Sequence, residues 1–210
     1  MNHLLRVLKV FWLPAETMYG AAERPAVVLP IAIPSVFAFL TSLTVYFTLP
    51  PSDVTLRTAW LVGLISAVLG PALITLIVAL LYFGIFSVAG RQGGFKAFLS
   101  VTAFAFLPTA LHHLAQSVMI LMPASEQLLP SQIGRLNVAV FLDPQAVSSE
   151  TYVAAGMIDV VSIWVLVLLT VGYRLVVSRR LTTWMVAGLV VGPWLLYAGL
   201  RIALAELIVF

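Results

Sequence analysis

Cysteine is absent from this chain of 210 residues. Its absence excludes disulfide bonds, thiolate nucleophiles and metal sites built on cysteine ligands. Charged residues are also scarce, since they make up 9% of the chain against 62% for hydrophobic residues. With a mean hydropathy of +1.10, this composition leaves a soluble domain too little polar surface to stay dispersed. The composition therefore predicts a protein that lies almost entirely in a lipid bilayer.

Catalytic and cofactor motifs are missing as well. The glycine-rich turn at Gly90–Gly94 lacks the order of a phosphate-binding loop, because Lys96 is followed by Ala97 rather than by Ser or Thr. The adjacent His112 and His113 would point about 100° apart on a helix, which makes them a poor chelating pair for zinc. No nucleophile and base stand in an evident partnership. We therefore expect no enzyme activity, no catalytic residue, no cofactor and no bound metal.

Long apolar segments dominate what is present. A bilayer core of about 30 Å requires about 20 helical residues, and five segments reach that length with few charges. Their approximate ranges are 26–49, 59–87, 95–122, 152–177 and 181–209. Because these runs are continuous rather than alternating, and because a spanning segment must satisfy its own backbone groups, each is predicted to be an α-helix. The predicted fold class is an all-α integral membrane protein, a bundle of five transmembrane helices preceded by a short amphipathic interfacial helix.

Prolines and small residues mark special positions inside these segments. Kinks or tilts are expected at the internal prolines, which are Pro30, Pro34, Pro71, Pro108 and Pro193. In the second segment Gly63, Ala67 and Gly70 recur at helical spacing. Such small residues allow helix backbones to approach closely in lipid, so we expect a packing seam there.

The basic residues predict how the chain is oriented. Eight of the eleven fall on one side of the predicted topology, namely Arg6, Lys9, Arg24, Arg91, Lys96, Arg174, Arg179 and Arg180, and the other side carries Arg57, Arg135 and Arg201. Short loops rich in Lys and Arg remain in the cytoplasm. The N-terminus is therefore predicted to be cytoplasmic and the C-terminus external, in the cytoplasmic membrane. The acidic balance of the long loop at 123–151 suits the external face.

Residues 1–25 are predicted to form a separate cytoplasmic segment ahead of a transmembrane domain at 26–210. On a helical wheel its apolar residues, Leu4, Leu5, Val7, Leu8, Phe11 and Trp12, lie opposite His3, Arg6 and Lys9. This separation is typical of a helix that lies in the membrane interface, and Pro14 would end it. No cleavable signal peptide is predicted, because only a few apolar residues follow Lys9 before Pro14.

The sequence pI near 9.5 is explained by these cytoplasmic cations and by contact with anionic lipid, rather than by binding to nucleic acid. The candidate contacts to lipid headgroups are Arg6, Lys9, Arg91, Lys96, Arg179 and Arg180. Gly93 and Gly94 would also leave free N–H groups at a helix start, where a lipid phosphate could dock. The expected partners are therefore anionic membrane lipids, with other membrane proteins or further copies of the chain as alternatives.

Polar residues inside the apolar segments form a second candidate site. They are His112, His113 and Gln116 in the third segment, and Asp159 and Ser162 in the fourth. A charge in hydrocarbon needs a partner, and the predicted depths of Asp159 and the histidines match. We expect a pair between Asp159 and His112 or His113, with Ser162 adding a hydrogen bond. The cluster would be a structural clamp, a site for a proton, an ion or a lipid headgroup, or a group that reaches the outer interface.

Three stretches resemble the bacterial branch of the Yip1 membrane-protein family. They are the opening FWLPAE at 11–16 with the prolines that follow, the segment GRQGGFKAFLSVTAFAFLP at 90–108, and the D-x-x-x-x-W pattern from Asp159 to Trp164. The resemblance implies a five-helix fold with a cytoplasmic N-terminus. Eukaryotic relatives act in vesicle traffic and contact small GTPases through a longer N-terminal region. Only about 25 residues precede the first segment here, so that role is not transferred.

Two functions remain open from the sequence. The leading hypothesis is a non-enzymatic membrane protein that acts by association with lipids or other membrane proteins, for example as an accessory to membrane machinery. The alternative is a small transporter or lipid-translocating protein that uses the intramembrane His/Asp site. An evident inverted repeat, which is common in transporters, is missing from the five segments.

Overall fold

The structure is a computed structural model that describes residues 3–48, 54–122, 137–143 and 145–205. Its elements are α1 (His3–Lys9), α2 (Pro14–Glu23), α3 (Val28–Thr48), α4 (Val54–Ala89), α5 (Phe95–Ala105), α6 (Thr109–Leu121), the 3-10 helix η2 (Val138–Phe141), α7 (Ser149–Met157), α8 (Val160–Val176) and α9 (Thr183–Ala203). Most of the external loop predicted at 123–151, including Glu126 and Arg135, lies outside the described residues, as does Glu206 near the C-terminus.

Helices of membrane-spanning length account for most of the described chain. Four segments are long and apolar enough to cross a membrane, namely Val28–Thr48, Trp60–Ala89, Phe95–Leu121 and Thr183–Ala203. Large apolar side chains are exposed along them, for example Val88 at 93% and Ile77 at 62%, as expected for a surface that faces lipid. The prediction of an all-helical membrane protein is therefore confirmed.

The fourth predicted span, at 152–177, is shorter than the sequence suggested. Its helix, α8, has 17 residues and is about 26 Å long, less than the roughly 30 Å of a bilayer core. The predicted segment at 152–177 is interrupted at Ile158 and Asp159, which separate α7 from α8. The count of five full-length spanning helices is thus not supported.

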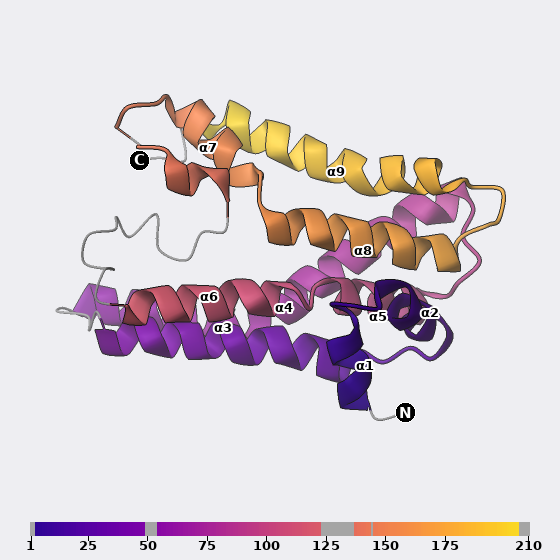
Figure 1. Cartoon of the computed structure of the whole chain (residues 1–210), viewed down its shortest axis with the longest axis horizontal. Coiled ribbons are helices and arrows are strands. Elements are labelled where there is room, and N and C mark those ends of the chain that lie inside the picture. The colour runs from indigo at the N-terminus through magenta and orange to yellow at the C-terminus, as the bar shows by residue number, and fades with distance from the viewer. Residues whose placement is uncertain (1–2, 49–53, 123–136, 144, 206–210) are drawn as a thin grey trace.

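The long helices form two layers that meet at one end (Figure 1). One layer contains α3 and α6, and the other contains α8 and α9, while α4 runs obliquely from the first layer to the second. At one end α2, α5 and α8 pack against one another, and we call this the packed end. We call the opposite end, where α6 finishes and α7 lies against α9, the open end.

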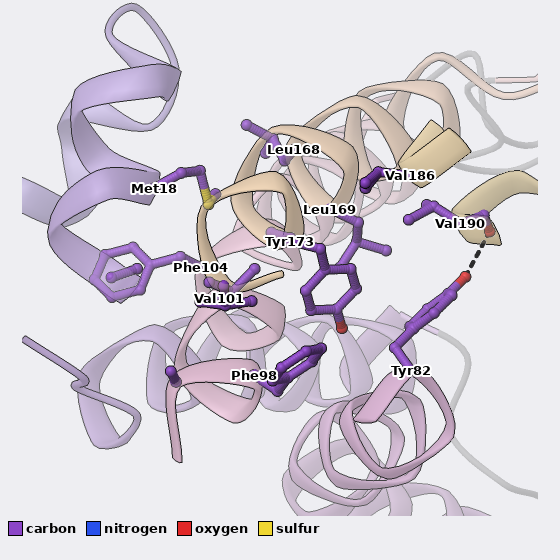
Figure 2. Close-up of a cluster of buried hydrophobic side chains, with 14 of the residues drawn as sticks. Met18, Tyr82, Phe98, Val101, Phe104, Leu168, Leu169, Tyr173, Val186 and Val190 are labelled. Atoms are coloured by element: carbon purple, nitrogen blue, oxygen red, sulfur yellow. Dashed lines mark hydrogen bonds between the residues drawn. The ribbon is translucent and has the colours of Figure 1, made fainter. Parts of the chain in front are cut away.

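Aromatic side chains form the core at the packed end (Figure 2). The ring of Tyr173 lies 5.1 Å from those of Phe98 and Tyr82, measured between centroids. The Tyr173 hydroxyl shares a hydrogen bond of 2.7 Å with Thr102 Oγ1, and the Tyr82 hydroxyl donates to the carbonyl of Val190 at 2.6 Å. Both buried hydroxyls are therefore satisfied inside the apolar core. These bonds tie α4 and α5 to α8 and α9.

The closest helix crossing in the core depends on Gly172 rather than on the predicted glycine seam. A Cβ added to Gly172 would clash with Val101 Cγ1 and approach Met18 Sδ to 3.1 Å, so α8 can approach α5 and α2 only because this side chain is missing. A Cβ on Gly63 or Gly70 would meet nothing within 4 Å. The predicted close approach at Gly63 and Gly70 is therefore wrong.

Of the internal prolines, Pro108 has the clearest effect. It is the last residue of the break between α5 and α6, where a ring without an N–H cannot continue the hydrogen-bonding pattern. Pro34, Pro71 and Pro193 instead lie inside continuous helices. Pro30 occupies the first turn of α3, where helix N–H groups have no acceptor within the helix in any case.

Candidate functional site

A cavity of about 710 Å³ separates the two layers. It is bounded by α4, α6, α8 and α9, and its lining is mostly apolar, with Ile74, Ile77, Val165 and Leu169 among the residues on its walls. Its volume lies within the range of roughly 300–1,000 Å³ that ligand pockets occupy. The layers diverge from the packed end, so side chains from opposite layers do not fill this space.

A smaller cavity of about 270 Å³ lies beside it, between α3, α4 and α6. The two cavities share four lining residues, which are Ile74, Phe106, Thr109 and His113. His113 therefore borders both spaces. Pro34 and Pro71 line the smaller cavity and Pro193 lines the larger one. A proline has no N–H for the carbonyl four residues earlier, so the cavity walls lie where the helices are locally depleted of backbone donors.

Asp159 is the N-cap of α8. Its carboxylate accepts hydrogen bonds from Val161 N at 3.2 Å, Ser162 N at 3.0 Å and Ser162 Oγ at 2.8 Å. The first N–H groups of a helix have no intrahelical acceptor, and inside a membrane no bulk water supplies one. A carboxylate at this end also complements the positive end of the helix dipole. The hydrogen bond from Ser162 that the sequence predicted is confirmed.

The predicted pair between Asp159 and a histidine is not formed in the structure. Among the described residues no hydrogen bond or ion pair joins Asp159 to His112 or His113. The carboxylate instead accepts its hydrogen bonds from the first turn of α8, because that helix begins at Asp159. All three side chains nevertheless line the larger cavity, together with Ser162. The structure thus brings four of the five predicted polar residues to one cavity.

The histidines are held by the packing of α6 against α3. The carbonyl of His113 accepts hydrogen bonds from Thr41 Oγ1 at 2.9 Å and from Ser117 Oγ at 3.0 Å. The two imidazole rings lie edge to face with 6.0 Å between centroids. Gln116, the fifth residue of the predicted cluster, is half-buried and is not among the residues that line either cavity.

Some lining residues were missed by sequence reasoning. Tyr82 from α4 and Pro193, Trp194 and Tyr197 from α9 complete the wall of the larger cavity, and nothing in the sequence places α9 opposite α6. The N-cap could have been found, because an Asp that immediately precedes an apolar run is a helix-start signal. Within the described residues no group of three or more His, Asp or Glu side chains could hold a metal ion.

Exposed cations gather at the packed end. Arg91, Lys96, Arg179 and Arg180 are all exposed. Arg91 lies on one turn and Arg179 and Arg180 on another, while Lys96 lies at the start of α5. The two turns lie side by side, because Ser178 N donates to Gly90 O at 2.8 Å and Arg91 pairs with Val177 as an isolated bridge. Gly90 adopts φ 121°, a conformation that favours glycine. The structure therefore brings together four of the six predicted headgroup contacts.

The N–H groups predicted to be free in this turn are partly occupied. Gln92 N and Gly93 N both donate to the carbonyl of Val176, at 3.0 and 2.8 Å. That carbonyl belongs to the last turn of α8, where acceptors lack intrahelical donors. The idea that Gly93 offers its N–H to a lipid phosphate is therefore wrong, and the turn instead completes the end of α8.

The remaining two predicted headgroup contacts, Arg6 and Lys9, do not form the outward cationic face that the helical wheel suggested. Arg6 is buried, with 7% of its surface exposed, and Val7 is buried beside it, while Leu5 and Leu8 are exposed. Burial lowers the pKa of Arg6 below its ordinary value, and the positive charge of Arg24 lowers it further. Lys9 makes an ion pair of 2.7 Å with Glu16. Packing of α1 on α2 thus overrides the predicted orientation.

Comparison with known proteins gives one match. The family described as Yip1 domain matches residues 8–204, which is most of the chain. No curated protein and no solved structure matches it. The matched range begins within α1 and ends after α9, so it contains both the cavity and the cationic turns.

Proposed function

Because the chain belongs to the Yip1 domain family and its apolar helices make it a membrane protein, we propose that it is a non-enzymatic protein of the bacterial cytoplasmic membrane that binds membrane lipid in the larger cavity. In this role it acts by association, as an accessory to lipids or to other membrane proteins. The N-terminal segment at 1–25 and the packed end face the cytoplasm, and the transmembrane domain comprises residues 26–210.

The larger cavity is the observation that carries this proposal. Its walls are apolar over most of their area, as an acyl chain requires. Its polar groups are few, namely those of Thr109, His112, His113, Asp159 and Ser162 and of the aromatic residues Tyr82, Trp194 and Tyr197. Few well-placed polar groups in an apolar pocket are typical of sites that orient a ligand. Lipid is the ligand available to a cavity between membrane helices.

The exposed cations at the packed end support the orientation. Arg91, Arg179 and Arg180 lie on two adjacent turns, and Lys96 lies in the first turn of α5. Each basic residue near an anionic leaflet contributes about 1 kcal/mol of attraction. They therefore favour a packed end on the cytoplasmic side, in contact with anionic headgroups.

Filling the cavity tests the proposal. Val161 lines the cavity, so Val161→Trp should occupy part of its volume and displace lipid. Ile163 lies on the same helix but is 51% exposed and is not among the lining residues, which makes Ile163→Trp the matched control. Native mass spectrometry of protein extracted in mild detergent should show lipid retained by the wild type and the control, with at least about a tenfold loss for Val161→Trp. Equal retention by all three proteins would refute the proposal.

A second candidate, lipid translocation or transport, is favoured by the contact between the two cavities. They share His113 and three other lining residues, so a ligand in one space lies next to the other. Flux of fluorescent lipid across reconstituted liposomes distinguishes the two functions. Flux that Val161→Trp abolishes would support translocation, whereas bound lipid without flux supports an accessory role.

A further inference from the structure

The guanidinium of Arg6 lies in a nearly complete enclosure at the packed end. Its Nη1 donates to the carbonyl of Arg24 at 3.1 Å, and its Cζ lies 4.8 Å from the centroid of the Phe104 ring. A Cβ on Gly20 would lie 3.0 Å from Nε and 3.1 Å from Cζ, so the group is close to the backbone of α2. The side chain is 7% exposed.

Two donors of this guanidinium have no acceptor. Nε and Nη2 are both buried and make no hydrogen bond. These two atoms form one edge of the guanidinium, the edge that binds a carboxylate or phosphate through two parallel hydrogen bonds. A buried donor without an acceptor is destabilising, and more so when it carries charge. The chain therefore presents an unused bidentate edge.

No described carboxylate serves as the partner of Arg6. The two acidic residues of α2 are engaged elsewhere, because Glu16 accepts from Lys9 at 2.7 Å and Glu23 accepts from the Tyr19 hydroxyl. A second cation, Arg24, acts on Arg6 through its positive charge. Two interacting positive charges, with no described carboxylate bonded to Arg6, create a region of positive potential.

We propose that Arg6, assisted by the charge of Arg24, binds a phosphate group through its Nε and Nη2 edge. Phosphate matches this edge in geometry and in charge, and two arginines suit a phosphate monoanion or dianion better than a single carboxylate. Large side chains are exposed around the site, with Leu5, Trp12 and Tyr19 at 55%, 61% and 54%. An apolar rim around a cationic site fits the headgroup region of a membrane.

The site differs from the lipid cavity, since it lies at α1 and α2 rather than between the two layers. The site rests on the proposed function in one respect only, namely that the phosphate would belong to a lipid. Inorganic phosphate tests the site without that assumption. Because both donors are enclosed, binding also requires the seven-residue α1 to shift away from α2, which provides a structural readout.

The test uses the full chain in a neutral detergent. It is titrated with short-chain phosphatidylglycerol, with the corresponding diacylglycerol and with inorganic phosphate, and binding is measured by calorimetry. Arg6→Lys keeps the charge but removes the bidentate edge, so phosphate binding should weaken about tenfold or more. Arg201→Lys is the matched control, because Arg201 lies in the last turn of α9, towards the open end and outside the proposed headgroup contacts; it should bind like the wild type.

The probes identify the source of the phosphate. Binding of phosphatidylglycerol alone assigns a lipid headgroup, and equal binding of inorganic phosphate assigns free phosphate; both support the site. Equal affinity of wild type and Arg6→Lys, or an equal loss in Arg201→Lys, overturns it. If Arg6→Lys does not fold, hydrogen–deuterium exchange of the wild type decides: a change on adding phosphate in residues 3–13 but not in 183–203 supports the site, and no change overturns it.

Discussion

At the scale of single residues, Asp159 shows how the chain accommodates a carboxylate between its apolar helices. The carboxylate accepts three hydrogen bonds from the first turn of α8, so its role is to start a helix where water is scarce. Arg6 is the opposite case, since it is buried with two donors unmet. The first charge is hydrogen-bonded within the chain, whereas the second is the one that we propose binds phosphate.

Substitution of Asp159 should separate capping from charge. Asn is about as good an N-cap as Asp, so Asp159→Asn should change the free energy of unfolding by only a few tenths of a kcal/mol. Asp159→Leu removes the acceptor and should lower the free energy of unfolding by about 1–2 kcal/mol. Melting temperatures in detergent measure the difference. If Asp159→Asn lost as much stability as Asp159→Leu, the carboxylate's charge rather than its hydrogen bonding would hold the start of α8.

At the scale of helices, the crossing of α8 over α5 and α2 holds the packed end together. Gly172 permits this crossing, and Tyr173, the next residue, enters the aromatic core shown in Figure 2. Away from the packed end, the helices pack less closely, and the larger cavity lies between α6 and α8. The helices are thus anchored at one end and divergent at the other, which is the arrangement that creates the cavity.

Glycine substitutions should reveal this difference between helix faces. Gly172→Ala would push a methyl group into Val101, and overpacking of this kind destabilises by about 1–3 kcal/mol. Gly188→Ala on α9 would meet nothing within 4 Å, so it should be neutral or slightly stabilising because alanine favours helix by about 1 kcal/mol over glycine. Thermal unfolding in detergent measures both. Equal effects of the two substitutions would contradict the assigned crossing.

At the scale of the whole molecule, the long helices run alternately between the two ends. The N-terminal helices α1 and α2 lie at the packed end, and α9 runs from that end towards α7 at the open end (Figure 1). The exposed cations of the turns at Gly90–Gly94 and Ser178–Leu181 also gather at the packed end. The side of the membrane that the packed end faces therefore fixes the orientation of the whole bundle.

Reporter fusions should determine this orientation. Fusions after Lys9, Arg91 and Arg180 should report a cytoplasmic location, and a fusion after Gly134, which lies outside the described residues, should report the external side, because loops rich in Arg and Lys stay in the cytoplasm. Paired alkaline phosphatase and fluorescent protein fusions provide the measurement. The reverse pattern would place the cationic end outside and contradict the proposed headgroup contacts.

The sequence by itself determined the solvent of this protein and the class of its fold. Long apolar runs must be helical in lipid because the backbone can find no other partners there, and this holds for Val28–Thr48 or Thr183–Ala203 whatever they pack against. Such properties are local, so they can be read from residue types and spacing.

Only the tertiary structure decided which residues meet. The orientation of Arg6, the contact of Gly172 with Val101 and the cavity beside His112 depend on residues far apart in the chain. Nearly every face of these helices is apolar, so hydrophobic patterning could not tell a lipid-facing side from a packed one. In lipid, helices associate through shape and a few hydrogen bonds rather than through removal of apolar surface from water, and those are properties of the assembled bundle.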